Sequence, residues 1–233
     1  MDKYPSTCVK KNPEKTAVNI RRTLLIILQL IMAVEVVVLL TKGEWLQAFL
    51  VCMIMTITTA PLLFSERMPV NIPPEFNMLV IIFVFASLFL GEIRGFYLRF
   101  WWWDIALHTG SGLLLGIFGF LLVYVLNENS RINVYLNIRF VALFAFLFAV
   151  AMGAMWEIFE FGMDQFFGTN MQGMIPGDPS SGLTDTMWDL IVDVLGAAAI
   201  SLPGWWYMKR RECSFIDAWI QKFIEKNPRF FPF

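Results

Sequence analysis

The sequence has 233 residues, of which 58% are hydrophobic and 16% are charged, and its formal net charge is −1. The hydrophobic share exceeds that of a soluble globular domain, which is roughly 45–50% apolar, and the mean hydropathy is positive at +0.62. This composition excludes an ordinary soluble domain and predicts a polytopic membrane protein, for which we expect a lipid bilayer and no nucleic acid as partner.

Six apolar runs are long enough to cross the roughly 30 Å hydrocarbon core of a bilayer as helices. The runs lack the alternation of barrel strands, and a helix satisfies its own backbone hydrogen bonds in lipid. We therefore predict an all-α protein with an N-terminal tail at 1–19, a transmembrane domain at 20–208 and a basic, amphipathic C-terminal tail at 209–233. The six predicted transmembrane helices cover 20–41, 45–64, 77–98, 104–126, 138–167 and 184–208.

Basic residues predict the orientation of these helices. With six helices threaded in order, most Lys and Arg residues fall on one side of the membrane, whereas Lys42 and Arg99 fall on the other. The longest loop on that other side, 168–183, contains no Lys or Arg. Because positive residues mark cytoplasmic loops, both termini are predicted to be cytoplasmic. The basic residues on the cytoplasmic side are Lys3, Lys10, Lys11, Lys15, Arg21, Arg22, Arg67, Arg131, Arg139, Lys209, Arg210 and Arg211.

The C-terminal tail carries an apolar stripe at helical spacing. This stripe predicts a short amphipathic helix on the inner membrane surface. Packing of the same helix on cytoplasmic loops is the alternative. The apolar residues are Phe215, Ile216, Trp219, Ile220, Phe223 and Ile224.

Three predicted helices carry ionisable residues at spacings of three or four, so that each set lies on one face of its helix. Threading places all three sets in the outer half of the membrane. At about 1.5 Å of rise per residue, Glu157 and Asp193 lie on the order of 10 Å below the outer surface. The sets are Asp104 and His108; Glu157, Glu160 and Asp164; and Asp185, Asp189 and Asp193.

So many acids in one layer imply a bound cation, shared protons or a wet cavity, because a charge at the helix centre costs roughly 2.5 to 3.5 kcal/mol. Carboxylates with one imidazole suit Mg²⁺, Mn²⁺ or Ca²⁺, with Zn²⁺ or Fe²⁺ as options if His108 ligates. The single histidine of the chain excludes a three-histidine zinc centre. The predicted metal ligands are Asp104, His108, Glu157, Asp189 and Asp193.

Other interpretations stay open for individual residues. Asp104, Asp164 and Asp185 are near predicted helix ends, where a carboxylate can reach water. A lone histidine is a structural hydrogen-bonding group as readily as a ligand or a proton relay. The Gly-, Pro- and Ser-rich loop at 168–183 is long enough to cover the site as a lid, or it is a plain connector.

Three segments carry a resemblance to known families. WWWDIALHTGSG, WEIFEFGMDQFFGTN and DTMWDLIVDVLGA, in this order, resemble the YjdF-type family of bacterial inner-membrane proteins. The spacing of their acidic residues is also distantly similar to that of VanZ-type proteins, where the matching acidic positions are partly amides. The resemblance covers about 101–198. It implies a multi-pass protein of the bacterial plasma membrane in which these residues form one constellation, and it implies no particular reaction.

Three functions fit these patterns. The first is a metal-dependent enzyme that acts on a lipid or isoprenoid phosphate from the outer side, with Glu160 or Asp164 as base and Arg94 as a clamp for an anionic headgroup. The second is a cation or proton-coupled transporter, against which the inner halves of the last three predicted helices offer almost no polar path. The third is a non-catalytic envelope accessory protein with a structural ion. The oligomeric state is not predicted.

Overall fold

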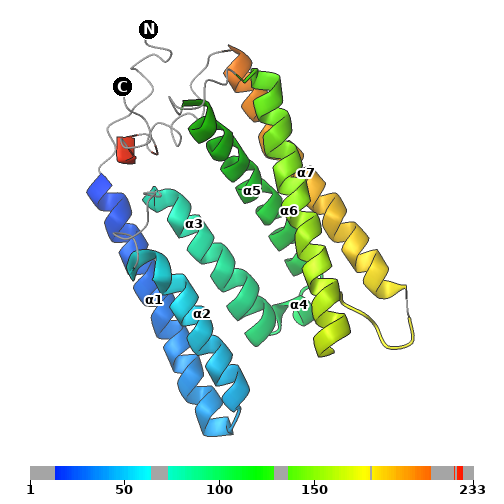
Figure 1. The fold of residues 1–233 in the computed structure, drawn as a ribbon. Helices are drawn as coiled ribbons and strands as arrows, with labels where there is room; N and C mark the ends of the chain where they lie inside the picture. Colours follow the sequence, from blue (N-terminus) through cyan, green and yellow to red (C-terminus); the bar gives the residue numbers. More distant parts are fainter. Residues whose placement is uncertain are drawn as a thin grey trace. The chain divides into compact units, whose positions relative to one another are not determined.

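The computed structural model describes residues 14–63, 73–128, 136–178, 180–210, 223 and 225–227. Within these ranges the secondary structure is helical, apart from one isolated bridge between Ile175 and Asp178. The described residues form two compact units, the first with 14–63, 73–103, 223 and 225–227 and the second with 104–128, 136–178 and 180–210, and each is described by itself. The helices are α1 (Glu14–Lys42), α2 (Trp45–Leu63), α3 (Pro74–Val84), the π-helix η2 (Phe85–Ile93), α4 (Phe96–Arg99), α5 (Trp103–Glu128), α6 (Ile138–Phe167) and α7 (Ser181–Arg210) (Figure 1).

The first unit is built on a hairpin of α1 and α2. The chain reverses at Gly43, whose φ of +78° is a left-handed conformation that favours glycine. Apolar side chains at helical spacing on both helices fill the seam, and the continuous segment of α3 and η2 packs against it. The buried core consists of Leu25, Leu28, Met32, Leu39, Ala48, Val51, Ile54, Ile81, Phe85 and Phe89.

Polar side chains fasten α1 to α2 within this hairpin. The Nε2 atom of Gln29 donates to Oγ1 of Thr58 and to Oγ1 of Thr59, both at 2.9 Å, and to the Met55 carbonyl oxygen at 3.1 Å. An amide group that faces lipid without a partner is costly, so this network favours one register of the two helices.

Replacing Gln29 with leucine is expected to lower the free energy of unfolding of the first unit by about 0.6 to 1.7 kcal/mol, the range measured for hydrogen bonds between membrane helices. Thermal unfolding in detergent micelles measures the change. Gln47→Leu, at an exposed position of α2, is the matched control and should have little effect. Equal stability of the two variants would show that the network does not hold the hairpin.

The third predicted helix differs from the structure at its end. α3 continues without a break into η2, and 74–93 together are long and apolar enough to span a membrane. The helix ends at Ile93 instead of residue 98, because Gly95 adopts a left-handed conformation with φ +66° and the chain restarts as α4. The Tyr97 ring lies against Gly91, and the hydroxyls of Tyr97 and Ser87 are 3.1 Å apart. The apolar run thus extends to residue 98, beyond the observed end of the helix at Ile93.

The second unit consists of α5, α6 and α7, which alternate in direction (Figure 1). Local signals set the bounds of α6. Its first turn is capped by the side chain of Asn137, which accepts a hydrogen bond from the Arg139 backbone N–H at 3.1 Å. It ends at Gly168, whose φ of +66° is the left-handed conformation common at helix C-termini.

Small residues allow α5 and α7 to approach until their backbones touch. A Cβ added to Gly112 would lie 2.6 Å from the Asp193 carbonyl oxygen, and one added to Gly196 would overlap the Thr109 carbonyl oxygen. Such contacts are typical of membrane helices, whose association depends on close packing. They also bring the start of α5 and the first half of α7 close enough for short polar side chains to meet.

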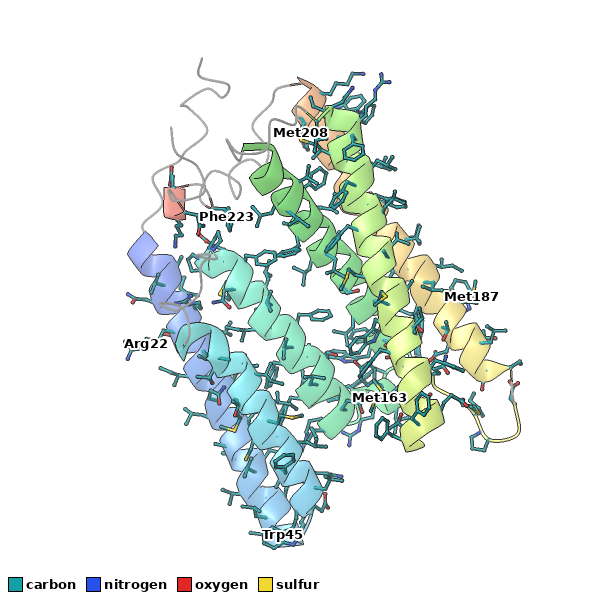
Figure 2. All side chains as sticks on the ribbon, viewed as in Figure 1. Arg22, Trp45, Met163, Met187, Met208 and Phe223 are labelled. Carbon is teal, nitrogen blue, oxygen red and sulfur yellow. The ribbon has the colours of Figure 1, made fainter. Side chains whose placement is uncertain are left out.

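The outward surfaces of the helices are apolar. Along α6, large exposed hydrophobic side chains recur at helical spacing, and Figure 2 shows side chains projecting from the outer faces of the helices. A soluble monomer rarely exposes a contiguous apolar surface of this kind, whereas a lipid environment favours it. The exposed residues of α6 are Ile138, Phe140, Leu143, Leu147, Met152, Met155, Trp156, Ile158, Phe159, Phe161, Phe166 and Phe167.

The predicted fold class is confirmed within the described residues. Five helices are long and apolar enough to span a membrane, and a sixth, Trp45–Ala60, is apolar but shorter. Arg67, Arg131 and nearly all of both tails lie outside the described residues. The cytoplasmic termini, the three-part domain division and the C-terminal amphipathic helix therefore stay predictions.

Candidate metal centre

Asp104, His108 and the acidic residues of α6 and α7 gather at one end of the second unit. That end contains the start of α5, the end of α6 and the start of α7 (Figure 1). In Figure 2, Met163 marks it on α6, while Met208 marks the opposite end of α7. Away from this end, the buried side chains described for the unit are apolar except for Ser201. The apolar ones are Phe120, Val123, Ala142, Ala145, Ala149, Ala197 and Ile200.

His108 lies at the centre of the cluster and is buried. Its Nδ1 atom is 3.3 Å from Oδ2 of Asp193, at the long end of hydrogen bonding. Its Nε2 atom is 3.7 Å from Oδ1 of Asp104 and 3.8 Å from Oε1 of Glu157. The two ring nitrogens therefore face different carboxylates, and the Nε2 distances are too long for direct hydrogen bonds.

Three of the predicted ligands meet in a group that could hold an ion. One ligand atom each from Asp104, His108 and Asp189 lies within 4.8 Å of the other two. Ligands about 2.1 to 2.5 Å from a divalent ion are separated by at most about 4 to 5 Å. The three residues come from the start of α5 and the first half of α7, which the glycine contacts hold together.

Glu157 supplies a buried carboxylate without a matching donor. Its side chain reaches the Nε2 side of His108, and the residue is only 4% exposed. Neither carboxylate oxygen forms a hydrogen bond of normal geometry with any described group, although the Thr186 hydroxyl is close enough to interact with it. A buried ionised carboxylate without partners costs several kcal/mol, so this position requires a proton or a cation.

Asp193 is the most deeply placed of the acids, with 1% exposure. Besides its contact with Nδ1 of His108, it accepts a hydrogen bond from the Ser111 hydroxyl at 2.9 Å through Oδ1. A Cβ added to Gly153 of α6 would overlap the Asp193 carboxylate. The absence of a side chain at Gly153 therefore makes the space that Asp193 occupies.

Glu160 lies one turn further along α6 and is also buried. Its Oε1 atom accepts a hydrogen bond from the indole N–H of Trp156 at 2.8 Å. The structure thus places Glu160 on the same helix face as Glu157, as the spacing predicted, with one oxygen oriented by Trp156.

Asp164 is bound to the loop that follows α6. Its Oδ1 accepts hydrogen bonds from the Thr169 hydroxyl (2.6 Å) and the Met171 backbone N–H (2.8 Å), and its Oδ2 accepts one from the Gln172 N–H (3.0 Å). These donors engage both oxygens, so the contacts support a role in holding the loop. The proposed role of Asp164 as a base stays a prediction.

The described part of the loop is ordered by further local contacts. Asp185 lies close to Gly173, where an added Cβ would be 2.6 Å from its Oδ2. Hydrogen bonds from the Ser180 hydroxyl and backbone N–H to the carboxylate lower the pKa of Asp178. The loop is therefore ordered over 168–178, and its role as a lid or a connector stays a prediction.

Replacing Asp164 with alanine is expected to loosen the loop and to leave metal binding unchanged, since the substitution removes three hydrogen bonds outside the His108 group. Limited proteolysis should then cut within 168–178 at least about tenfold faster, the factor that 1.4 kcal/mol of lost stability gives. Asp178→Ala is the control, because that carboxylate bonds only the second part of the loop. Unchanged cleavage together with lost metal would instead make Asp164 a ligand.

Arg94, predicted as a headgroup clamp, belongs to the first unit. Its Nη1 atom lies 2.9 Å and 3.0 Å from the two carboxylate oxygens of Glu35, so the two side chains form an ion pair between the end of η2 and α1. The Arg94 side chain remains 43% exposed. This pairing gives Arg94 a structural role in its unit, and its role as a clamp stays a prediction.

Sequence reasoning missed the supporting residues of the cluster. Spacing marked Asp193 as a ligand but did not indicate that it faces Nδ1 of His108 or that Gly153 leaves room for its carboxylate. The contacts of Ser111 with Asp193 and of Trp156 with Glu160 were not predicted either. A small residue on α6 opposite an acid on α7 can be recognised only when the helices are placed together.

Comparison with known proteins identifies the family. A family model described as "Predicted membrane protein (DUF2238)" matches residues 22–210. The chain belongs to this family. Membership of DUF2238 makes it an integral membrane protein, in agreement with its helices, and is consistent with the YjdF-type resemblance. The VanZ-type similarity stays a prediction.

The DUF2238 chain is also similar to an uncharacterized protein of Thermotoga maritima. The two are 29% identical over 138 residues, which are 59% of this chain and 65% of that relative. The match thus spans just under two thirds of the relative's length. No solved structure matches the chain.

Proposed function

We propose that this DUF2238 protein binds a divalent cation between α5, α6 and α7, and that this end of the unit is the active centre of a membrane-embedded enzyme for phosphate-bearing lipids. The observation that carries the proposal is Glu157, a carboxylate with 4% exposure that is directed at the Nε2 side of His108 without a normal hydrogen bond. Asp104 and Asp189 meet the same imidazole. One imidazole leaves most of this negative charge uncompensated, and a divalent cation would offset two of the carboxylate charges.

The donor set favours hard or borderline ions. Three carboxylates and one imidazole are oxygen-rich, which suits Mn²⁺ and Mg²⁺, and the nitrogen extends the range to Zn²⁺ and Fe²⁺. Ca²⁺ fits less well because it prefers oxygen ligands alone. We assign Asp104, His108, Glu157 and Asp189 as the ligands.

The surroundings of the cluster support a lipid substrate. Exposed aromatic side chains of α6 flank its acidic end, so an amphiphile in the bilayer can place its chain on them and its headgroup near the cluster. A metal ion and an anionic phosphate attract each other strongly where little water surrounds them, as at this buried cluster. The flanking residues are Trp156, Phe159, Phe161, Phe166 and Phe167.

The reaction that suits these groups is hydrolysis of a phosphate ester, including an isoprenoid phosphate. A water oxygen bonds to phosphorus, the bond from phosphorus to the lipid oxygen breaks, and the released alcohol takes a proton from solvent. Glu160, buried on the same helix face as Glu157 and oriented by Trp156, accepts the proton that the attacking water loses. A divalent cation held by Asp104, His108, Glu157 and Asp189 would polarise the phosphoryl oxygen.

Replacing Glu160 with glutamine is therefore expected to lower turnover by about 10²- to 10⁴-fold, the usual contribution of a general base, while metal affinity changes little. The measurement is phosphate release from phosphatidic acid and from polyprenyl phosphate in mixed micelles, with Mn²⁺, Mg²⁺ or Zn²⁺ added. Trp156→Phe, which removes the indole N–H donor and keeps a smaller aromatic ring, should give a smaller loss. Metal-dependent release that is unchanged in Glu160→Gln would contradict the assignment of the base.

A cation transporter is the competing function, since buried acids also line ion pathways. The apolar interior of the described unit away from the cluster argues against a path across the membrane. Ion flux into proteoliposomes that is lost on Asp189→Asn would favour transport. Metal binding with neither flux nor turnover would favour a structural ion in an accessory protein.

A further inference from the structure

We infer that Asp193 is a positioning residue: it holds the proton of His108 on Nδ1, with Ser111 and Gly153 fixing its carboxylate, so that Nε2 is the nitrogen presented to the cation. This inference rests on the proposed metal site and goes beyond it, because it replaces Asp193 as a ligand with Asp193 as the group that orients one.

The geometry separates the two sides of the imidazole ring. Asp193 is the acid at Nδ1, 3.3 Å away, whereas Asp104 and Glu157 are at Nε2, 3.7 and 3.8 Å away. A neutral imidazole has one N–H, so an N–H that donates to Asp193 leaves the Nε2 lone pair free to ligate. Second-shell carboxylates commonly orient metal-bound histidines in this way.

The Asp193 carboxylate is itself fixed from both sides. The hydroxyl of Ser111 on α5 shares its proton between Oδ1 of Asp193 at 2.9 Å and the His108 carbonyl oxygen at 2.7 Å, and its contact with Oδ1 leaves Oδ2 for His108. On the other side, the bare Cα of Gly153 on α6 leaves room for the carboxylate, which an added Cβ would overlap. Each of the three helices therefore contributes to the position of one oxygen atom, and that position decides the tautomer of His108.

The single histidine of the chain makes a direct test practical. Protein purified through a histidine-free tag and labelled with ¹⁵N-histidine gives the signals of one imidazole only. In the wild type we expect a proton on Nδ1, and on Zn²⁺ addition a shift of the Nε2 resonance with Nδ1 still protonated. Loss of the Nδ1 proton on zinc addition, or a proton on Nε2 alone before zinc is added, would overturn the inference.

Two variants displace the carboxylate by independent routes. Asp193→Ala removes it, and Gly153→Ala pushes it aside while every polar group remains. Both should lower Zn²⁺ or Mn²⁺ affinity by about 10- to 100-fold, the usual effect of losing such a partner, and both should abolish the preference for Nδ1–H. Asp193→Asn, whose amide oxygen can still accept from Nδ1, should restore that preference. Retention of the preference in both alanine variants would overturn the inference.

Gly162→Ala controls for the gain in helix propensity at Gly153, because a Cβ at Gly162 has no neighbour within 4 Å. It should leave the spectrum and the affinity unchanged. The test also separates the two proposals. If zinc shifts neither nitrogen, but Nδ1–H is present in the wild type and lost in Asp193→Ala, the metal site fails while the positioning role of Asp193 stands.

Discussion

Asp189→Asn is expected to lower the affinity for a divalent cation by at least about 100-fold, the upper end of what the loss of a supporting residue costs. Asp189 is 3% exposed and belongs to the group of close ligand atoms with Asp104 and His108. The amide keeps the shape of the side chain but removes its negative charge. Calorimetric titration of the purified protein with Mn²⁺ or Zn²⁺ measures the effect.

The same substitution should remove the stabilisation that the metal gives. An ion at 100 times its Kd stabilises the folded state by about 2.7 kcal/mol, so the wild type should unfold at a higher temperature with metal and the variant should not respond. Asp185→Asn is the matched control, because Asp185 lies one turn earlier on α7, beside Gly173 and outside the group of three. Equal affinity of Asp189→Asn and the wild type would remove Asp189 from the site.

Gly196→Ala is expected to destabilise the second unit by about 1 to 3 kcal/mol, the usual cost of overpacking. The added Cβ would overlap the Thr109 carbonyl oxygen, and backbone cannot turn aside as a side chain can. The helices must then separate, which also disturbs the His108 cluster that their contact supports. Thermal unfolding in detergent and metal affinity should both fall.

Gly110→Ala is the comparison, and its expected effect on the stability of the second unit has the opposite sign. A Cβ there has no neighbour within 4 Å, so the substitution should be neutral or should stabilise the helix by up to about 1 kcal/mol. Both glycines are helical and near the cluster, which makes them a matched pair. If the two alanine variants unfolded alike, close contact of α5 and α7 would not support the unit.

The sequence predicted the helices well because their signal is simple. A run of apolar residues long enough to cross lipid has few alternatives to a helix, and α6 ends at residue 167 as predicted because Gly168 follows it. The end of the third predicted helix was wrong, because the apolar run continues after the helix has ended. Gly95 breaks the helix there, and nothing in the hydropathy of the run marks the change to a π-helix.

The spacing of acids predicted which residues share a helix face but not what each one contacts. Asp104, His108 and Asp189 meet, as the threading suggested. The split of Asp193 from Glu157 across the two nitrogens of His108 depends on helix rotation and on the space above Gly153, which spacing does not encode. Asp164 shows the same limit, because its partners are loop atoms whose positions depend on the turn after α6.

The central claim is that the single histidine of the chain shares a metal ion with carboxylates of α5, α6 and α7. Electron spin-echo envelope modulation of protein-bound Mn²⁺ tests it most directly, since it detects ¹⁴N nuclei coordinated to the ion. We predict one bound Mn²⁺ per chain with the modulation of one imidazole nitrogen, lost in His108→Gln. Failure of the purified protein to bind Mn²⁺, or a bound ion without imidazole modulation, would contradict it.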